Sequence, residues 1–250
     1  ATNRVTITPA PLGVTVNAIY SGSTVVSPSA FTVTGLVNNQ TIAGISAATI
    51  NNANVSANTN NFVTAITVSS GTASMSNYSI TPAYNSLAGN TRNTVTLTPK
   101  SLTVTGVTIA AKIYDGTTAA VVSGGSLVGV VSGDAANVTL TQTASFVSAG
   151  AANNVALIMN GSIAGSASSN YTLTVPTGIT ANIARRALTV GGTSVAANKV
   201  YDGTTATTIS GGTLSGVITA DLPNVSLSQS GSFVQSGVGT GLGVVVSTSI

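Results

Sequence analysis

Internal repetition constrains the fold of this chain more than any other feature of its sequence. The sequence KIYDGTT at residues 112–118 returns as KVYDGTT at residues 199–205, an offset of 87 residues. The same offset links four further pairs of segments: SGGSLVGV (123–130) with SGGTLSGV (210–217), Asp134 with Asp221, NVTL (137–140) with NVSL (224–227), and SFV (145–147) with SFV (232–234). The chain is therefore built from successive copies of one structural unit.

A more divergent copy precedes these two. YSGST at residues 20–24 aligns with YDGTT at 114–118, and NYSIT at 77–81 aligns with NYTLT at 170–174. We expect three repeats, at about residues 10–98, 99–184 and 185–250. The third is expected to be incomplete at its C-terminal end, because no Asn-Tyr segment follows Phe233. Residues 1–9, which contain VTITP like the VTLTP of 95–99, resemble the terminal strand of a preceding unit. We expect a window of a longer array; the alternative is donor-strand exchange, in which residues 1–9 complete the open unit of a neighbouring copy.

The local pattern predicts strands throughout. Segments such as TVTLT, LTVTGV and YTLTV alternate threonine with valine, isoleucine or leucine, which places polar and apolar side chains on opposite faces of a strand. Glycine and asparagine clusters separate these segments, and no stretch has a helical period. We predict an all-β fold: a tandem array of small β-sandwich units, Ig-like or related, of about 87–94 residues each.

The near-absence of charge excludes most catalytic chemistry. Only 4% of the residues are charged, all four acids are aspartate, and the chain has no histidine and no cysteine. Histidine general bases, thiolate nucleophiles and zinc-cysteine sites are therefore absent from the sequence. We predict a protein that is not an enzyme, with no catalytic and no cofactor-binding residue. Seven dispersed basic residues predict no nucleic-acid partner, and the lack of a long apolar run predicts no membrane insertion.

The few charges occupy equivalent positions in the last two repeats. Lys112, Asp115 and Asp134 correspond to Lys199, Asp202 and Asp221. The first repeat carries Ala18, Ser21 and Gln40 at these positions, so the three charges are present together or absent together. This pattern suggests that each set forms one constellation.

Three hypotheses explain this set of charges. In the first, Asp-Gly forms a tight turn and lysine pairs with a carboxylate, which is purely local structure. In the second, Asp115, Asp134, Asp202 and Asp221 contribute oxygen ligands to calcium, although the sequence lacks the usual spacing of a calcium loop. In the third, a lysine forms an isopeptide crosslink with aspartate or asparagine. Apart from calcium in the second hypothesis, the sequence suggests no cofactor.

The motifs of the last two repeats resemble a known family. K-x-Y-D-G-T-T, S-G-G-x-L-x-G-V, an aspartate and N-Y-T-L-T together are similar to the YDG-type repeat, and the first repeat resembles the related mostly-β, glycine-rich MBG repeat. The structural motif residues are Lys112, Tyr114, Asp115, Gly116, Asp134, Lys199, Tyr201, Asp202, Gly203 and Asp221. Both repeat types occur in tandem in large bacterial surface adhesins, including filamentous-haemagglutinin-like exoproteins. The resemblance implies a segment that is extracellular, on the bacterial cell surface.

The expected function is that of a stalk or filament segment of a secreted surface adhesin, which supports adhesion, aggregation or biofilm formation. The expected partners are neighbouring repeats of the same chain, further copies through self-association, and other cell-surface polymers. An alternative is a carbohydrate-binding module, which requires a concave cluster of aromatic and amide side chains. Tyr114 and Tyr201 are interpreted as core anchors rather than platforms for sugars.

Overall fold

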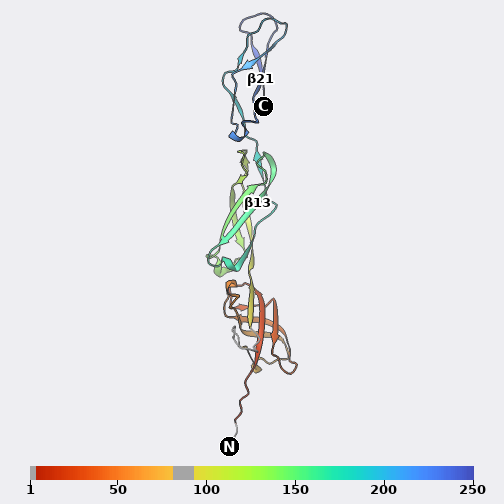
Figure 1. Ribbon diagram of the computed structural model, residues 1–250, viewed down its shortest axis with the longest axis vertical. Helices are drawn as coiled ribbons and strands as arrows, with labels where there is room; N and C mark the ends of the chain where they lie inside the picture. The colour runs from red at the N-terminus through yellow and green to blue at the C-terminus, as the bar shows by residue number, and fades with distance from the viewer. Residues whose placement is uncertain (1–3, 81–92) are drawn as a thin grey trace. The chain divides into compact units, whose positions relative to one another are not determined.

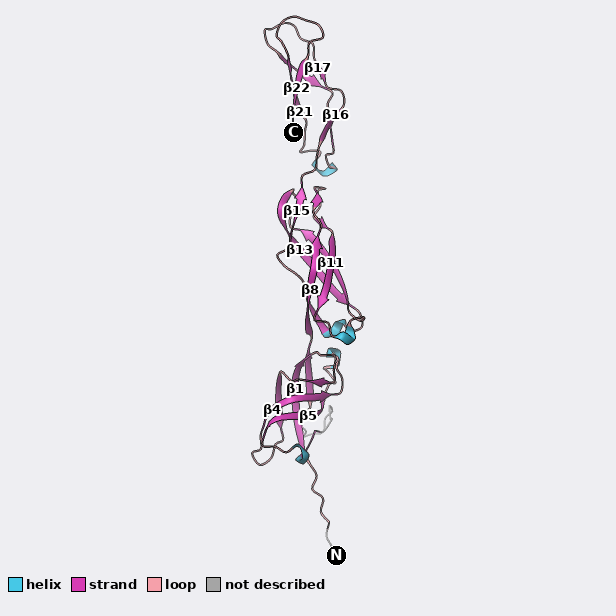
Figure 2. Ribbon diagram, turned by 180° about the vertical axis from the view of Figure 1, so that it is seen from behind, coloured by secondary structure: helices cyan, strands magenta, loops and turns pink. Residues whose placement is uncertain are grey.

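The computed structural model describes residues 4–80 and 93–250 of the chain. Strands, turns and 3₁₀ segments of three residues each form its secondary structure (Figure 2). The prediction of an all-β chain is confirmed. Across the described residues, no helix is both long enough and apolar enough to cross a membrane.

The first repeat forms two sheets. Its elements are β1 (Ala10–Ile19), β2 (Val25–Val26), β3 (Ala30–Thr34), β4 (Ile42–Ile50), η1 (Val55–Ala57), β5 (Val63–Gly71), η2 (Met75–Asn77), β6 (Tyr78–Ile80) and β7 (Thr94–Thr98). One sheet has the order β3-β1-β6, with β7 also paired to β1, and the other has the order β2-β4-β5. Strands β6 and β7 both run parallel to β1.

The alternation read from the sequence builds the core between these sheets. In β7, Val95 and Leu97 are buried while the threonines on either side are partly or fully exposed. They pack with Val14 and Val16 of β1 and with apolar side chains of β4 and β5 in one cluster. Because both sheets contribute their apolar faces to the same cluster, the first repeat is a small β-sandwich.

The second repeat has the same parallel pairings. Its elements are β8 (Lys100–Ile109), β9 (Lys112–Ile113), β10 (Ala119–Ala120), β11 (Val122–Val128), η3 (Ser132–Asp134), β12 (Thr139–Phe146), β13 (Ala152–Ala164), η4 (Ser168–Asn170), β14 (Tyr171–Thr174) and β15 (Thr180–Ala184). Strand β14 runs parallel to β8, as β6 does to β1, and β15 runs parallel to β9. The sheets have the orders β11-β8-β14 and β10-β12-β13-β15-β9.

The third repeat has shorter strands and no buried core. Its elements are β16 (Thr189–Gly191), β17 (Val195–Ala196), β18 (Ala206–Thr207), β19 (Ile209–Ser210), β20 (Thr213–Ser215), η5 (Thr219–Asp221), β21 (Ser228–Phe233) and β22 (Val244–Ser249) (Figure 1). They form the sheets β16-β20, β17-β19 and β18-β21-β22. Among the residues described, 185–250 contain no side chain that is fully buried and no counterpart of β14 or β15.

The contacts of the chain define two compact units whose limits differ from those of the repeats. One unit comprises Ala1–Thr108, Val122–Thr143 and Met159–Thr177, and the other comprises Ile109–Val121, Ala144–Ile158 and Gly178–Ile250. The junction between the first and second repeats therefore lies within one unit. The junction between the second and third repeats lies within the other.

Candidate functional site

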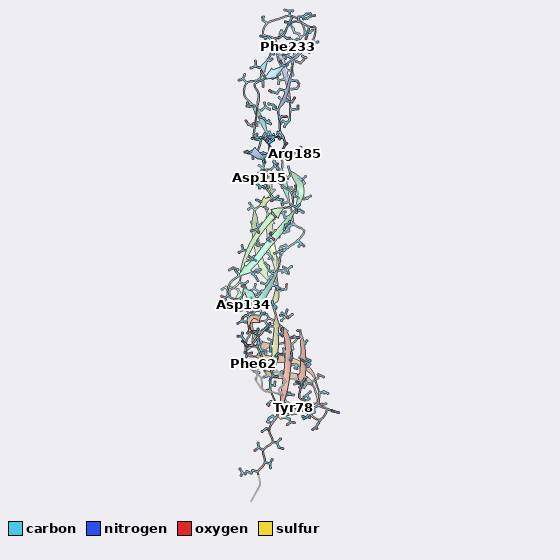
Figure 3. All side chains as sticks on the ribbon, viewed as in Figure 1. Phe62, Tyr78, Asp115, Asp134, Arg185 and Phe233 are labelled. Atoms are coloured by element: carbon cyan, nitrogen blue, oxygen red, sulfur yellow. The ribbon has the colours of Figure 1, made fainter. Side chains whose placement is uncertain are left out.

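Asp134 forms the centre of the junction between the first and second repeats (Figure 3). Its Oδ2 accepts hydrogen bonds from the hydroxyls of Tyr20, at 2.7 Å, and Tyr171, at 2.6 Å. The two rings meet edge to face, with centroids 5.3 Å apart, and the tyrosines are only 4% and 6% exposed. Buried tyrosine hydroxyls require a partner, and an ionised carboxylate is a strong one. One carboxylate thus satisfies a tyrosine from each repeat.

The fold of the second repeat positions this carboxylate. Asp134 ends the 3₁₀ turn η3, where its N–H donates to the Val131 carbonyl at 2.8 Å. Tyr171 begins β14, which is held against β8, and its hydroxyl also accepts a hydrogen bond from the Val131 N–H at 3.0 Å. The Asp134 acceptor is therefore fixed by its own turn and by a tyrosine from the neighbouring strand.

Two further contacts complete this junction, which we call the first joint. The Tyr20 N–H donates to the carbonyl of Thr98, at 2.9 Å, and only Pro99 lies between Thr98, the last residue of β7, and the first residue of β8. Gly22 has a φ of +73° and lies against Val131, where an added Cβ would be 2.8 Å from the valine Cγ1. Only glycine combines this backbone conformation with so close an approach.

The buried amide of Asn170 adds another link to the first joint. Its Oδ1 accepts a hydrogen bond from the Val55 N–H at 2.9 Å, and its Nδ2 donates to Asn54 Oδ1 at 3.0 Å. The Asn-Tyr motif of the second repeat therefore contributes both of its side chains to the contact with the first repeat.

The second joint, between the second and third repeats, has the same arrangement, with Tyr114 in the place of Tyr20 and Asp221 in the place of Asp134. Tyr114 donates through its hydroxyl to Asp221 Oδ2 at 2.9 Å, and through its N–H to the Ala184 carbonyl at 2.9 Å. Gly116, with a φ of +77°, lies against Ile218, where an added Cβ would be 2.5 Å from Cδ1. Tyrosine, glycine, a β-branched residue and aspartate thus have the same roles at both joints.

The two joints differ at the position of Tyr171. Among the described residues, a single tyrosine donates to Asp221, and a cavity of about 390 Å³ borders this joint. Its lining includes Tyr114, Leu188, Ile218 and Asp221. In the first joint the corresponding residues surround Tyr171. The cavity therefore lies at the position that β14, the strand beginning at Tyr171, fills in the second repeat.

The environment of the joints keeps their tyrosines protonated. Burial, followed by the hydrogen bond to Asp134, raises the pKa of Tyr171 to about 12 and raises the pKa of Tyr20 further. The hydrogen bond to Asp221 is the main cause that raises the pKa of Tyr114. All three hydroxyls thus remain hydrogen-bond donors at neutral pH.

The lysine and the first aspartate of the motif stabilise the loop that carries the tyrosine. Lys112 Nζ lies 2.7 Å from Asp115 Oδ1 and donates to the carbonyls of Thr117 and Ala119. Asp115 Oδ1 in turn accepts from the Thr117 N–H at 2.8 Å and from its hydroxyl at 2.9 Å. The pKa of Asp115 is lowered to about 2, chiefly by the hydrogen bond from Lys112. We call this closed loop the lysine clamp.

The third repeat contains the same clamp but presents its tyrosine to solvent. Lys199 lies 2.7 Å from Asp202, Thr204 bonds to Asp202 as Thr117 does to Asp115, and the pKa of Asp202 is also lowered to about 2 by the lysine. Tyr201 is nevertheless 65% exposed, and no described atom lies within 4 Å of a Cβ built on Gly203. The core-anchor interpretation of Tyr201 is therefore wrong.

The first repeat contains a turn like the one that carries Asp134, with a glutamine in place of the aspartate. Gln40 replaces the aspartate and accepts a hydrogen bond through Oε1 from the Tyr78 hydroxyl. The Val37 N–H donates to the same hydroxyl at 3.2 Å, as Val131 does to Tyr171. Tyr78 begins β6, the counterpart of β14. The acceptor, the turn and the tyrosine are thus in place, with an amide instead of a carboxylate.

The structure separates the charged residues that the sequence grouped together. Lys112 pairs with Asp115 and Lys199 with Asp202, whereas Asp134 and Asp221 accept hydrogen bonds from tyrosines of the preceding repeat. In residues 4–80 and 93–250 no cluster of three acidic, histidine or cysteine side chains could hold a metal ion. The prediction that the three charges form one constellation is therefore wrong. The lysine and the first aspartate form a clamp within a repeat, and the second aspartate accepts a hydrogen bond from the preceding repeat.

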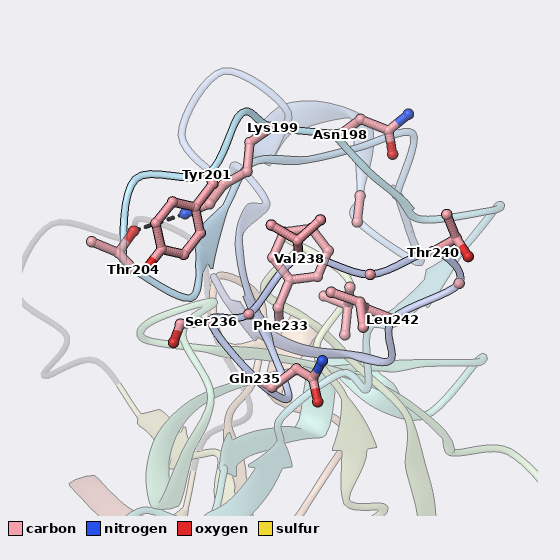
Figure 4. A pocket seen from close by; sticks show the side chains of 15 residues that line it. Asn198, Lys199, Tyr201, Thr204, Phe233, Gln235, Ser236, Val238, Thr240 and Leu242 are labelled. Atoms are coloured by element: carbon pink, nitrogen blue, oxygen red, sulfur yellow. Dashed lines mark hydrogen bonds between the residues drawn. The ribbon is translucent and has the colours of Figure 1, made fainter.

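An open cavity of about 510 Å³ lies in the third repeat (Figure 4). Apolar side chains of Phe233, Leu242 and Val244 line it together with Tyr201 and the amide side chains of Asn198 and Gln235. Val234 N–H bonds to the Gly243 carbonyl as Val147 N–H does to that of Ala156, so Leu242 and Val244 correspond to Val155 and Leu157.

In the second repeat this position is filled by the protein itself. Phe146, Val155 and Leu157 pack around Ile183 of β15, which is 2% exposed. Leu97 of β7 has the same place in the first repeat, since Leu97 pairs with Ala18 as Ile183 pairs with Lys112. The cavity therefore lies at the position that Ile183 of β15 fills in the second repeat and Leu97 of β7 fills in the first.

Comparison with known proteins agrees with the repeat organisation. The family model of the YDG domain matches residues 98–179 and 184–250, which together are more than half of the chain. Neither the curated proteins nor the solved structures contain a match. The chain belongs to the YDG domain family.

Proposed function

We propose that this chain is a stalk segment of a secreted bacterial surface adhesin, and that it is structural rather than enzymatic. Its role is to hold an adhesive part of the protein away from the cell by linking β-repeats in a fixed order. The membership in the YDG family supports this proposal, as does the resemblance of the motifs to tandem repeats of surface adhesins.

The observation that carries the proposal is the repetition of one joint at both junctions. In each, a tyrosine hydroxyl bonds to an aspartate of the next repeat, and the tyrosine N–H bonds to the strand that leads into that repeat. At the first junction a single residue separates β7 from β8. A joint with side-chain, backbone and covalent links close together resists bending, which is what a stalk requires.

The composition fits the same role. With 4% charged residues, electrostatic repulsion between neighbouring stalks is weak, and their surfaces present mainly threonine, serine and asparagine. Such surfaces hydrogen-bond to each other and to other cell-surface polymers. The location that follows from this proposal is extracellular, on the bacterial surface.

A carbohydrate-binding function has one observation in its favour. The cavity of the third repeat combines Tyr201 and Phe233 with the amides of Asn198 and Gln235, as sugar sites do. However, its counterpart in the second repeat is filled by Ile183. The same surface is thus used for a strand within this chain, and the stalk is the better supported function.

The experiment that tests the proposal displays the full chain on a bacterium as a spacer between an anchor and an epitope. If the chain is a stiff stalk, antibody should bind the epitope better with this chain as the spacer than with a flexible glycine-serine linker of equal length. Equal access with both spacers would contradict it. A glycan array probed with the same protein tests the alternative, and saturable binding that is lost in Tyr201→Ala would support the carbohydrate module.

A further inference from the structure

The two lysine clamps enclose the two Asp-Gly sequences of the chain. Of its four aspartates, Asp115 and Asp202 precede glycine, and each pairs with a lysine three residues before it. Asp134 and Asp221 precede other residues, and a β-branched residue stands three positions before each of them. The first repeat, where serine precedes the glycine of the motif, has no lysine there either. The lysine of the motif therefore accompanies Asp-Gly in particular.

An Asp-Gly sequence can rearrange without any enzyme. The backbone nitrogen of the glycine attacks Cγ of the aspartate, so that a C–N bond forms and a carboxyl C–O bond breaks. The amide proton and the carboxyl hydroxyl leave together as water, which gives a cyclic succinimide. Water then opens the ring, and opening at the backbone carbonyl gives isoaspartate, whose main chain is one methylene longer. Glycine favours the attack because it has no side chain to obstruct it.

The geometry of the clamp opposes this attack. Asp115 Oδ1 lies 2.7 Å from Lys112 Nζ, and it accepts hydrogen bonds from the Thr117 N–H at 2.8 Å and the Thr117 hydroxyl at 2.9 Å. Three donors thus hold the carboxylate to groups other than Gly116. Ring closure, which turns Cγ toward the Gly116 nitrogen, has to displace them.

The lysine also keeps the carboxyl group in its less reactive form. The neutral acid is the better target, because its hydroxyl leaves as water, whereas the carboxylate repels a nucleophile. The hydrogen bond from Lys112 is the chief cause that lowers the pKa of Asp115 to about 2, so at neutral pH the neutral fraction is about a hundredfold smaller than at the ordinary pKa near 4. Lys199 has the same effect on the pKa of Asp202.

We propose that the lysine clamp protects an Asp-Gly sequence from conversion to isoaspartate, and that Asp115 and Asp202 are the sites of this modification once a clamp opens. This role goes beyond the stalk function and does not depend on it. At Asp115 it also concerns the second joint, because the preceding residue is Tyr114, whose hydroxyl bonds to Asp221. An extra methylene beside Tyr114 would displace that hydroxyl.

A single digestion measures the modification, because the chain has only four aspartates. The full chain is incubated for weeks at neutral pH, unfolded, and digested with an endoproteinase that cuts before aspartate but not before isoaspartate. Loss of the cut at Asp115 or Asp202, relative to the cuts at Asp134 and Asp221, gives the rate at each site. In the wild type, both sites are expected to react more slowly than a synthetic KIYDGTT peptide.

Removing one lysine is predicted to expose one site alone. Lys112→Met should raise the rate at Asp115 about tenfold, since the neutral fraction grows tenfold for each unit by which the pKa rises. The rate at Asp202 should not change. Lys199→Met should have the converse effect, so each variant is the control for the other. Lys112→Arg keeps a cation and its donors and should remain close to the wild type.

Thr117→Val supplies a second variant that retains the lysine. It removes the hydroxyl donor to Asp115 and is expected to raise the rate at Asp115 by less than Lys112→Met does. An unchanged rate at Asp115 in both variants would overturn the proposal, as would an equal rise at Asp115 and Asp202 in Lys112→Met. A wild-type rate equal to that of the peptide would also contradict it. None of these results bears on the stalk function, which depends on Asp134 and Asp221.

Discussion

The hydroxyl of Tyr20 in the first repeat donates a 2.7 Å hydrogen bond to the carboxylate of Asp134 in the second. The two residues are 114 positions apart, and the same contact recurs between Tyr114 and Asp221. This contact accounts for the positions of Asp134 and Asp221. The first repeat keeps its tyrosine, which needs Asp134 of the next repeat, and has Gln40 where its own aspartate would be.

Removing the Asp134 carboxylate is predicted to destabilise the first joint. Asp134→Ala leaves the buried hydroxyls of Tyr20 and Tyr171 without their acceptor, and we expect the free energy of unfolding to fall by about 3 kcal/mol. Asp134→Asn keeps an acceptor oxygen, as Gln40 does for Tyr78, and should cost about half as much. Urea unfolding followed by tyrosine fluorescence measures both. Equal stability of Asp134→Ala and the wild type would contradict the role of Asp134.

Glycine at the first joint is predicted to be more sensitive to substitution than the equivalent glycine of the third repeat. Gly22 and Gly203 have φ values of +73° and +79°, so alanine strains the backbone equally at both. Only at Gly22 does the added Cβ meet a neighbour, Val131. Gly22→Ala should therefore lower stability by about 1–2 kcal/mol more than Gly203→Ala. Equal losses would show that close packing at Val131 contributes nothing.

The protein is predicted to lose stability above pH 10. The pKa of Tyr171 is raised to about 12 and that of Tyr20 is raised further, while tyrosines in the unfolded chain titrate near 10. Above pH 10 the unfolded state thus binds fewer protons than the folded state, and the free energy of unfolding falls as pH rises. Tyr20→Phe should flatten this dependence. Circular dichroism and tyrosinate absorbance across this range measure it, and an unchanged slope would contradict the assignment.

The lysine clamps are predicted to lose their contribution in acid. The pKa values of Asp115 and Asp202 are lowered to about 2, chiefly by the lysines, so each clamp is fully formed above the ordinary pKa near 4 and weakens as pH falls toward 2. Carboxyl carbon shifts in NMR titrations report these values directly. Lys112→Met should raise the pKa of Asp115 alone and leave Asp202 unchanged. Titration of Asp115 near pH 4 in the wild type would show that the clamp does not form.

The sequence was sufficient to predict the strands and their repetition. The alternation of threonine with valine and leucine in residues 94–98 predicts that Val95 and Leu97 are the buried side chains of β7. The structure confirms that both are buried. The recurrence of K-x-Y-D-G-T-T likewise identifies residues with equivalent roles, and the clamps around Lys112 and Lys199 are alike.

The partners of the aspartates could not be predicted in this way. Lys112, Asp115 and Asp134 are present or absent together, which suggests one constellation, but Asp134 bonds to tyrosines and one of them belongs to the preceding repeat. The alignment of repeats compares equivalent positions and carries no information on contacts between successive copies. One feature of the sequence did point to a separate role for the tyrosine. The first repeat keeps it as Tyr20, although it lacks the lysine and both aspartates of the motif.

The Tyr20–Asp134 joint is predicted to make the first repeat move as one body with the part of the second repeat that belongs to the same compact unit. NMR relaxation of backbone amides in the full chain measures this most directly, by comparing rotational correlation times for residues 10–80 with those for residues 122–143 and 159–177. The joint predicts one common value in the wild type and two different values in the Tyr20→Phe, Asp134→Ala double variant. Two different values in the wild type, at neutral pH, would contradict the account.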